Sequence, residues 1–219
     1  MSHHVHPYSF RLGILRDWKS RWFHKKQFAK LLKEDVLLRE WLMKKLRQQL
    51  VSGIEIERSR NTMTIYIKTP RPGLLIGRGG EGIEKLKKEV QKKTGLKDLK
   101  LTIEEVRNPY ADASVVARLV CQDLEKRLPF RRVLKSNIEK VMGSGDVKGV
   151  RIQVSGRLDG SEMGRREWLR KGSIPLQTLR ADVDFARDRA TLPYGTIGAT
   201  VWIYRGEIFQ KDTDKNKKP

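Results

Sequence analysis

The segment Gly73-Leu74-Leu75-Ile76-Gly77-Arg78-Gly79-Gly80 says most about the fold of this 219-residue chain. It lies between an apolar turn and the first residues of an amphipathic helix. The glycines at 77, 79 and 80 lack a Cβ, so the backbone can come close to a molecule outside the loop. A helix start adds unpaired N–H groups and partial positive charge, which favour a phosphodiester. We therefore expect Gly77, Arg78, Gly79 and Gly80 to contact nucleic-acid backbone. The alternative is a tight turn that binds nothing.

Three regular elements are predicted before this loop. Apolar residues at helical spacing predict a helix that has Asp35 as its N-cap and stops at Gly53. Two stretches of alternating hydrophobicity, 54–57 and 63–67, then predict a hairpin with its turn at Arg60-Asn61. The loop itself follows a short apolar helical turn.

Two further elements are predicted after the loop: a helix closed by Gly95 and a strand at 99–103. The complete order is αββααβ, with a G-x-x-G sequence between the fourth and fifth elements. This arrangement resembles the prokaryotic-type KH domain, whose G-x-x-G loop holds the backbone of single-stranded nucleic acid. Lys85 and Lys88 lie on the polar face of the helix after the loop, where phosphate contact and a merely solvated surface are equally good interpretations.

Charge indicates the class of partner. The chain has 47 Lys and Arg against 26 Asp and Glu, a formal net charge of +21, and only 38% apolar residues. Such a surplus of positive charge favours a polyanion, either nucleic acid or anionic lipid. No apolar stretch is long enough to span a bilayer and the first ten residues lack a signal-peptide core, so we expect no membrane association. A single cysteine, Cys121, excludes an internal disulfide and a cysteine zinc site, and favours the cytosol or an organelle of similar redox state.

The second half predicts an α+β domain. Asn108-Pro109 marks the boundary, and two helices separated by Pro129 follow it. In the second helix Arg131, Arg132 and Lys135 occupy one arc, and a cluster of one sign indicates an external anion. The alternative is pairing with acids elsewhere in the fold.

Three strands are predicted beyond Gly149, at 150–154, 179–185 and 197–204, in a small mixed or antiparallel sheet. Between the first two, a Gly-rich turn is expected to lead into a short basic helix. Its arginines give a second place for phosphate contact, although a plain surface loop explains them nearly as well. These candidates are Arg157, Arg165 and Arg166.

The domain organisation predicted from these patterns has four parts. Residues 1–34 form an N-terminal arm with a short helix, 35–106 the KH domain, 107–210 the C-terminal α+β domain, and 211–219 a disordered basic tail.

Other chemistry is weakly indicated, and we expect no cofactor, no metal and no catalysis. His3, His4 and His6 lack further ligands nearby and are interpreted as a disordered end. Asp182 and Asp184 are better explained as an edge of the sheet neutralised by Arg180 than as cation ligands. Cys121 lies on the apolar side of its helix and is expected in the core.

Several motifs in order resemble the family of the third protein of the small ribosomal subunit of bacteria and organelles, a KH-domain ribosomal protein family. The resemblance covers all but about the last ten residues. Its motifs are Val5-His6-Pro7, Phe10–Ile14, Leu75–Gly80, Phe130–Arg132, Val154–Leu158, Leu179–Asp182, Tyr194-Gly195, Val201–Ile203 and Gly206–Ile208.

The resemblance implies a function without catalysis. It implies that the chain binds small-subunit ribosomal RNA in the subunit head, touches neighbouring proteins including the tenth and fourteenth, and travels with cytoplasmic or organellar ribosomes. It also implies that Arg131, Arg132 and Lys135 face the tunnel through which messenger RNA enters and aid its unwinding. Gly79 replaces the family's usual basic residue in the loop. The alternatives are a free KH regulator of messages and a metal-dependent nuclease using Asp182, Asp184 and Glu207.

Overall fold

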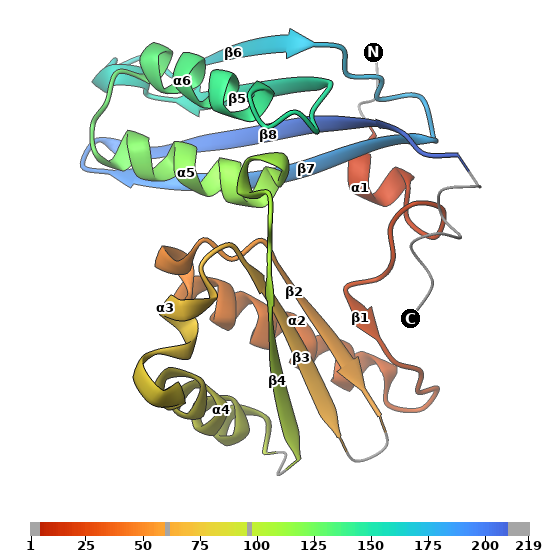
Figure 1. Cartoon of the computed structure of the whole chain (residues 1–219). Helices are drawn as coiled ribbons and strands as arrows, with labels where there is room; N and C mark the ends of the chain where they lie inside the picture. The colour runs from red at the N-terminus through yellow and green to blue at the C-terminus, as the bar shows by residue number, and fades with distance from the viewer. Residues whose placement is uncertain (1–4, 60–61, 96–97, 210–219) are drawn as a thin grey trace. The chain divides into compact units, whose positions relative to one another are not determined.

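The computed structural model describes residues 5–59, 62–95 and 98–209, which form two compact units (Figure 1). The first unit comprises Trp18–Arg107, and the second combines the residues up to Asp17 with those from Asn108 onward. The turn expected at Arg60-Asn61, the histidines at 3 and 4, and the tail 211–219 lie outside the described residues.

The αββααβ order predicted for the KH domain is confirmed in the first unit. Its elements are β1 (Ser20–Arg21), α2 (Phe28–Lys45), η1 (Arg47–Gln49), β2 (Gly53–Arg58), β3 (Met63–Thr69), α3 (Pro72–Ile76), η2 (Arg78–Gly80), α4 (Glu81–Thr94) and β4 (Leu99–Glu105). The sheet order is β1-β2-β3-β4, with β2 and β3 antiparallel and the two outer pairs parallel.

Alternation along the strands forms the core of this unit. β3 has the burial pattern expected of a strand with one face in the core, and its inward residues Met63, Ile65 and Ile67 are fully buried. Leu42 of α2 and Val90 of α4 belong to the same apolar cluster. Both helices therefore pack on one face of the sheet, and this packing positions the loop that precedes α4.

Asp35 is not the N-cap of α2, so that prediction was wrong. The helix begins at Phe28, and Asp35 lies inside it, fully buried. Its carboxylate accepts hydrogen bonds from Arg58 Nε and from Trp22 Nε1, each at 2.7 Å. Aspartate is a common N-cap residue, but Asp35 is instead the buried partner of Arg58, which is distant in sequence. Gly53 does not end the helix either, because it opens β2.

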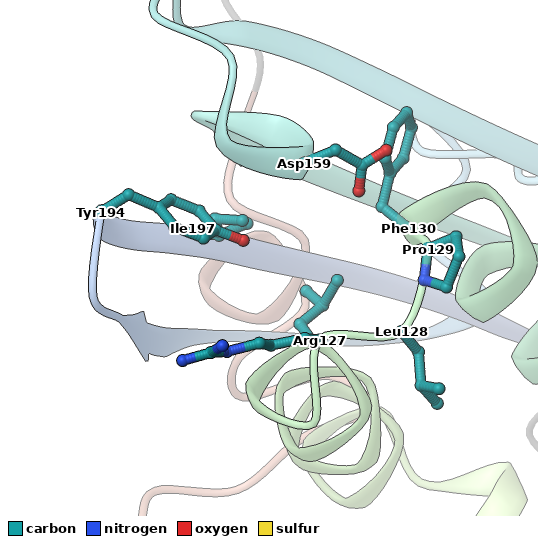
Figure 2. Close-up of a pocket in the computed structure, with 8 residues that line it drawn as sticks. Arg127, Leu128, Pro129, Phe130, Asp159, Tyr194 and Ile197 are labelled. Carbon is teal, nitrogen blue, oxygen red and sulfur yellow. The ribbon is translucent and has the colours of Figure 1, made fainter.

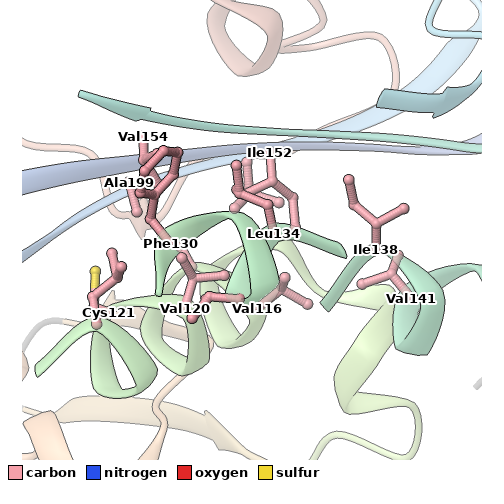
Figure 3. Close-up of a cluster of buried hydrophobic side chains, with 14 of the residues drawn as sticks. Val116, Val120, Cys121, Phe130, Leu134, Ile138, Val141, Ile152, Val154 and Ala199 are labelled. Carbon is pink, nitrogen blue, oxygen red and sulfur yellow. The ribbon is translucent and has the colours of Figure 1, made fainter. Parts of the chain in front are cut away.

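The second unit is an antiparallel sheet covered by two helices (Figure 1). Its elements are α1 (Pro7–Phe10), η3 (Pro109–Ala111), α5 (Ala113–Glu125), α6 (Phe130–Met142), β5 (Gly149–Gly156), η4 (Leu158–Gly160), β6 (Arg165–Gly172), β7 (Ala181–Leu192) and β8 (Gly195–Glu207). The strand order is β6-β5-β8-β7. Figure 3 shows the core between helices and sheet, where Val116, Leu134 and Ile152 meet.

The short basic helix predicted after the Gly-rich turn is wrong, because the structure has strand β6 there. Residues 165–172 instead form an edge strand that pairs with β5 from Gly156↔Arg165 to Gly149↔Gly172. Arg, Glu, Leu and Lys are good helix formers, but pairing with a neighbouring strand overrides such a weak local preference. Arg165 and Arg166 therefore point to opposite faces of the sheet.

Arg11 attaches the beginning of the chain to the second unit. Its fully buried guanidinium donates from Nε to the carbonyl of Ala181 at 2.6 Å. It also donates to the carbonyls of Pro7, Pro175, Leu176 and Thr178. The segment 1–34, expected as one arm, is thus divided between the two units from residue 5 onward.

Candidate nucleic-acid interface

The loop at 77–80 is open to solvent and needs glycine. Gly77, Gly79 and Gly80 have φ values of 71°, 60° and 83°, in the left-handed region where a Cβ is unfavourable. Residues 77–79 are exposed, and α4 begins immediately afterwards at Glu81. Unpaired N–H groups at the start of this 14-residue helix therefore lie beside an exposed, nearly bare backbone.

Gly82 holds the loop in shape by allowing close approach between α3 and α4. A Cβ on Gly82 would lie 2.5 Å from the carbonyl oxygen of Leu75 and 2.9 Å from that of Ile76. No side chain can occupy that space without moving one of the two helices. This role of Gly82 was not predicted from the sequence, although a fourth glycine so close to the loop was the available signal.

Charge around the loop is only partly neutralised. Arg78 and Lys88 are exposed and form no ion pair with any residue that the structure describes. Lys85 lies 2.6 Å from Glu81, one turn earlier, with both side chains largely exposed. A surface pair of this kind is weak, but Glu81 still reduces the attraction of Lys85 for an external anion.

The three cations of α6 project from a helix whose other side is buried in the core. Arg132 and Lys135 are exposed, and within the described part of the chain neither has a carboxylate partner. Arg131 Nε lies 3.4 Å from Glu167 of β6, but the arginine side chain remains 72% exposed. Among the described residues, therefore, only Arg131 of the three cations pairs with an acid, and this exposed pair is weak.

The arginines of the Gly-rich connection have different environments. Arg157 donates hydrogen bonds to the carbonyls of Ser161, Tyr194 and Gly160, so its guanidinium holds this loop together. Arg165 lies 3.5 Å from Glu167, on the helix side of β6, and also over the ring of Phe130. The structure thus places Arg165 next to Arg131, whereas Arg166 faces the other side of the sheet.

Comparison with known proteins agrees with both units. Residues 37–111 match the family model of the KH domain, and residues 120–203 match that of the ribosomal protein S3 C-terminal domain. Proteins named small ribosomal subunit protein uS3 are similar over nearly the whole chain. That of Anaeromyxobacter sp. (strain Fw109-5) is 48% identical, covering 95% of this chain and 92% of the relative. That of Enterococcus faecalis is 44% identical, covering all of both. This chain belongs to the uS3 family.

One pocket in this uS3-family chain lies at the start of α6 (Figure 2). Its volume is about 270 Å³, and its lining includes Arg127, Phe130, Asp159 and Tyr194. Arg127 and Asp159 both adopt positive φ, which marks the two turns that meet there. One carboxylate and one guanidinium, without a nucleophile and base in contact, give the pocket no catalytic arrangement.

The carboxylates of the nuclease alternative are held by arginines. Asp182 lies 2.6 Å from Arg16, and Asp184 lies 3.1 Å from Arg205 and accepts the N–H of Ala113. Within residues 5–59, 62–95 and 98–209, no cluster of three His, Cys, Asp or Glu side chains is arranged to hold a metal ion.

Arg180 was expected to neutralise Asp182 and Asp184, and this prediction was wrong. Arg180 pairs instead with Glu207, at 2.5 Å.

Cys121 is buried in the core, as expected, and burial raises the pKa of its thiol. Among the described helices, none has the length and apolar character that crossing a bilayer requires.

Proposed function

We propose that this uS3-family chain is a structural, non-enzymatic constituent of the small ribosomal subunit that binds ribosomal RNA through two separate surfaces. The first comprises the loop residues Gly77, Arg78, Gly79 and Gly80 with Lys85 and Lys88. The second is the Gly-rich connection that Arg157 stabilises, with Arg165 and Arg166 on opposite faces of the strand that follows it. The observation that carries the proposal is the exposed, left-handed glycine backbone at the start of α4. Such a backbone can approach a phosphodiester that any Cβ would keep away.

We also propose that Arg131, Arg132 and Lys135 face the tunnel through which messenger RNA enters, within the subunit head and beside neighbouring proteins including the tenth and fourteenth. Their exposure and the near absence of carboxylate partners support contact with an external polyanion. A rigid helix holds them in one arc. They can capture a strand that has already opened, while translocation supplies the energy for opening it.

Ribosomes assembled with the R131A/R132A/K135A variant test the second proposal. We expect normal assembly, normal speed on an unstructured message and slower passage through a hairpin placed downstream. The matched control K30A/K33A/K44A removes three exposed cations of α2 and should leave both speeds unchanged. Equal speeds of the α6 variant on structured and unstructured messages would refute the tunnel role.

Sedimentation separates this function from that of a free KH regulator. Nearly all of the protein should travel with small subunits and complete ribosomes in cell extracts. A predominantly free population would favour the regulator. Mg²⁺-dependent RNA cleavage by the purified chain, lost in D182N, would favour the nuclease.

A further inference from the structure

The face of the second unit's sheet that lies opposite α5 and α6 has an unusual composition. Val150, Ile152 and Val154 of β5 point into the core beneath the helices, so the alternate residues point the other way. At one end of this face Val183 and Tyr204 are covered by Ile174 and Leu176. The rest of the face, called the open face below, carries the side chains that strand register assigns to it: Arg151, Gln153, Ser155, Arg166, Trp168, Arg170, Phe185, Arg187, Arg189, Thr200 and Trp202. None of these positions carries a carboxylate.

Arginines and aromatic rings alternate across this open face. The guanidinium of Arg151 lies 4.7 Å from the ring centre of Trp168 and 5.0 Å from that of Trp202. Arg170 lies over Trp168 at 6.0 Å and Arg187 over Phe185 at 5.2 Å. Cation–π contacts of this kind hold flat groups against one another, so the rings and guanidinium planes form a stacking surface.

Arg151, Arg166 and Arg170 lie near one another on the open face, and none of the three pairs with a carboxylate among the residues that the structure describes. Burial lowers the pKa of Arg151, and the charges of Arg170 and Arg166 lower it further. The Nε atom of Arg151 is buried and has no hydrogen-bond partner among the described residues. Trp168 is nevertheless 49% exposed, so a planar ligand can reach its ring. A cluster of like charges attracts an anion, and an anion that also carries flat groups can stack on the accessible rings as well.

We propose that the open face binds unpaired nucleotides of RNA. Bases stack on Trp168 and the adjacent guanidinium planes, and Arg166, Arg170 and Arg187 pair with phosphates. Single strands offer both groups, whereas a duplex hides its base faces. The inference rests on the proposed RNA-binding function and adds a site of different chemistry. The 77–80 loop contacts the RNA backbone, whereas the open face stacks against bases.

Adjacent residues of one strand provide a matched test. W168A/R170A removes one ring and one cation from the open face, and L169A/K171A removes one apolar side chain and one cation from the opposite side of β6. Affinity of the full-length variants is measured for a 12-nucleotide single-stranded RNA and for a blunt duplex. We expect W168A/R170A to bind the single strand roughly 5- to 100-fold more weakly, the range for loss of base stacking. L169A/K171A should lose only a small, salt-sensitive factor shared by both RNAs.

Two further variants make the outcome decisive. W168F keeps a ring and should retain most single-strand affinity, and thermal unfolding curves verify that each variant is folded. Equal losses in W168A/R170A and L169A/K171A would mean that charge alone matters, which overturns the inference. So would unchanged RNA binding by W168A/R170A together with failure to associate with other small-subunit proteins, because the face would then bind protein.

The loop variant R78E separates failure of this inference from failure of the proposed function. If R78E weakens RNA binding and W168A/R170A does not, only the stacking face is rejected. If the unaltered chain binds neither RNA, the proposed function itself fails.

Discussion

Arg58 Nε lies 2.7 Å from Asp35 Oδ1, and this carboxylate, in the middle of α2, has no exposed surface. The guanidinium side chain is itself only 9% exposed. A buried charge left without its partner is strongly destabilising, even where the intact pair contributes little. The pair therefore ties α2 to β2 beneath the surface of the first unit.

Asp35→Ala is expected to destabilise the first unit by about 3–5 kcal/mol, because it removes the buried partner of Arg58 and leaves the guanidinium with only the partly exposed Glu34. Urea unfolding followed by tryptophan fluorescence measures the change, since Trp22 donates to the same carboxylate. Glu34→Ala is the control: Glu34 also lies 3.0 Å from Arg58 but is 37% exposed. Its loss should change stability by less than about 1 kcal/mol. Equal effects of the two substitutions would contradict the buried-pair interpretation.

Gly82→Ala is expected to cost about 1–3 kcal/mol and to weaken RNA binding, because the new Cβ overlaps the carbonyl of Leu75 and separates α3 from α4. Gly73→Ala provides the comparison, since a Cβ there meets nothing within 4 Å and its φ is not positive. That variant should be neutral or slightly stabilising, with unchanged RNA affinity. Calorimetry and filter binding give the two quantities. Normal RNA binding by Gly82→Ala would show that the loop does not depend on this close approach.

Salt dependence distinguishes the cations around the loop. Each phosphate contact to single-stranded RNA contributes a slope of about −0.7 in a plot of log affinity against log salt. Arg78→Ala and Lys88→Ala should each reduce the steepness by about that amount. Lys85→Ala should reduce it less, because Lys85 already lies beside Glu81. A flat profile for the unaltered protein would argue against electrostatic binding altogether.

Glu55 makes the first unit sensitive to acid. Burial alone would raise the pKa of Glu55, but the hydrogen bond and charge of Lys68 and the charge of Arg21 together hold it below its ordinary value. A carboxyl group whose pKa is lower in the folded state stabilises the protein above its unfolded pKa, about 4.3, and loses this contribution as pH falls through the folded value. The free energy of unfolding of the unaltered protein should therefore fall more between about pH 5 and pH 3 than that of Glu55→Gln. Parallel pH profiles for the two proteins would rule out this contribution.

Features of the fold that depend on residues close together in sequence could be predicted from the sequence. The αββααβ order, the glycine loop and the α6 cations follow from residue spacing and from glycine chemistry, and the structure contains all three. Asp35 was misassigned because its partner, Arg58, lies in another element. Residues 165–172 were expected to be helical because their strand exists only through pairing with β5. The open face could not be predicted at all, since it requires the register of four strands.

The carbonyls that hold Arg11 come mainly from residues 175–181, so Arg11 binds a segment that is synthesised more than 160 residues later. During synthesis, Trp18–Arg107 are complete and can fold while Arg11 still lacks these acceptors. The KH unit is therefore an insertion between two distant parts of its neighbour, and the second unit closes only after most of the chain has left the translating ribosome.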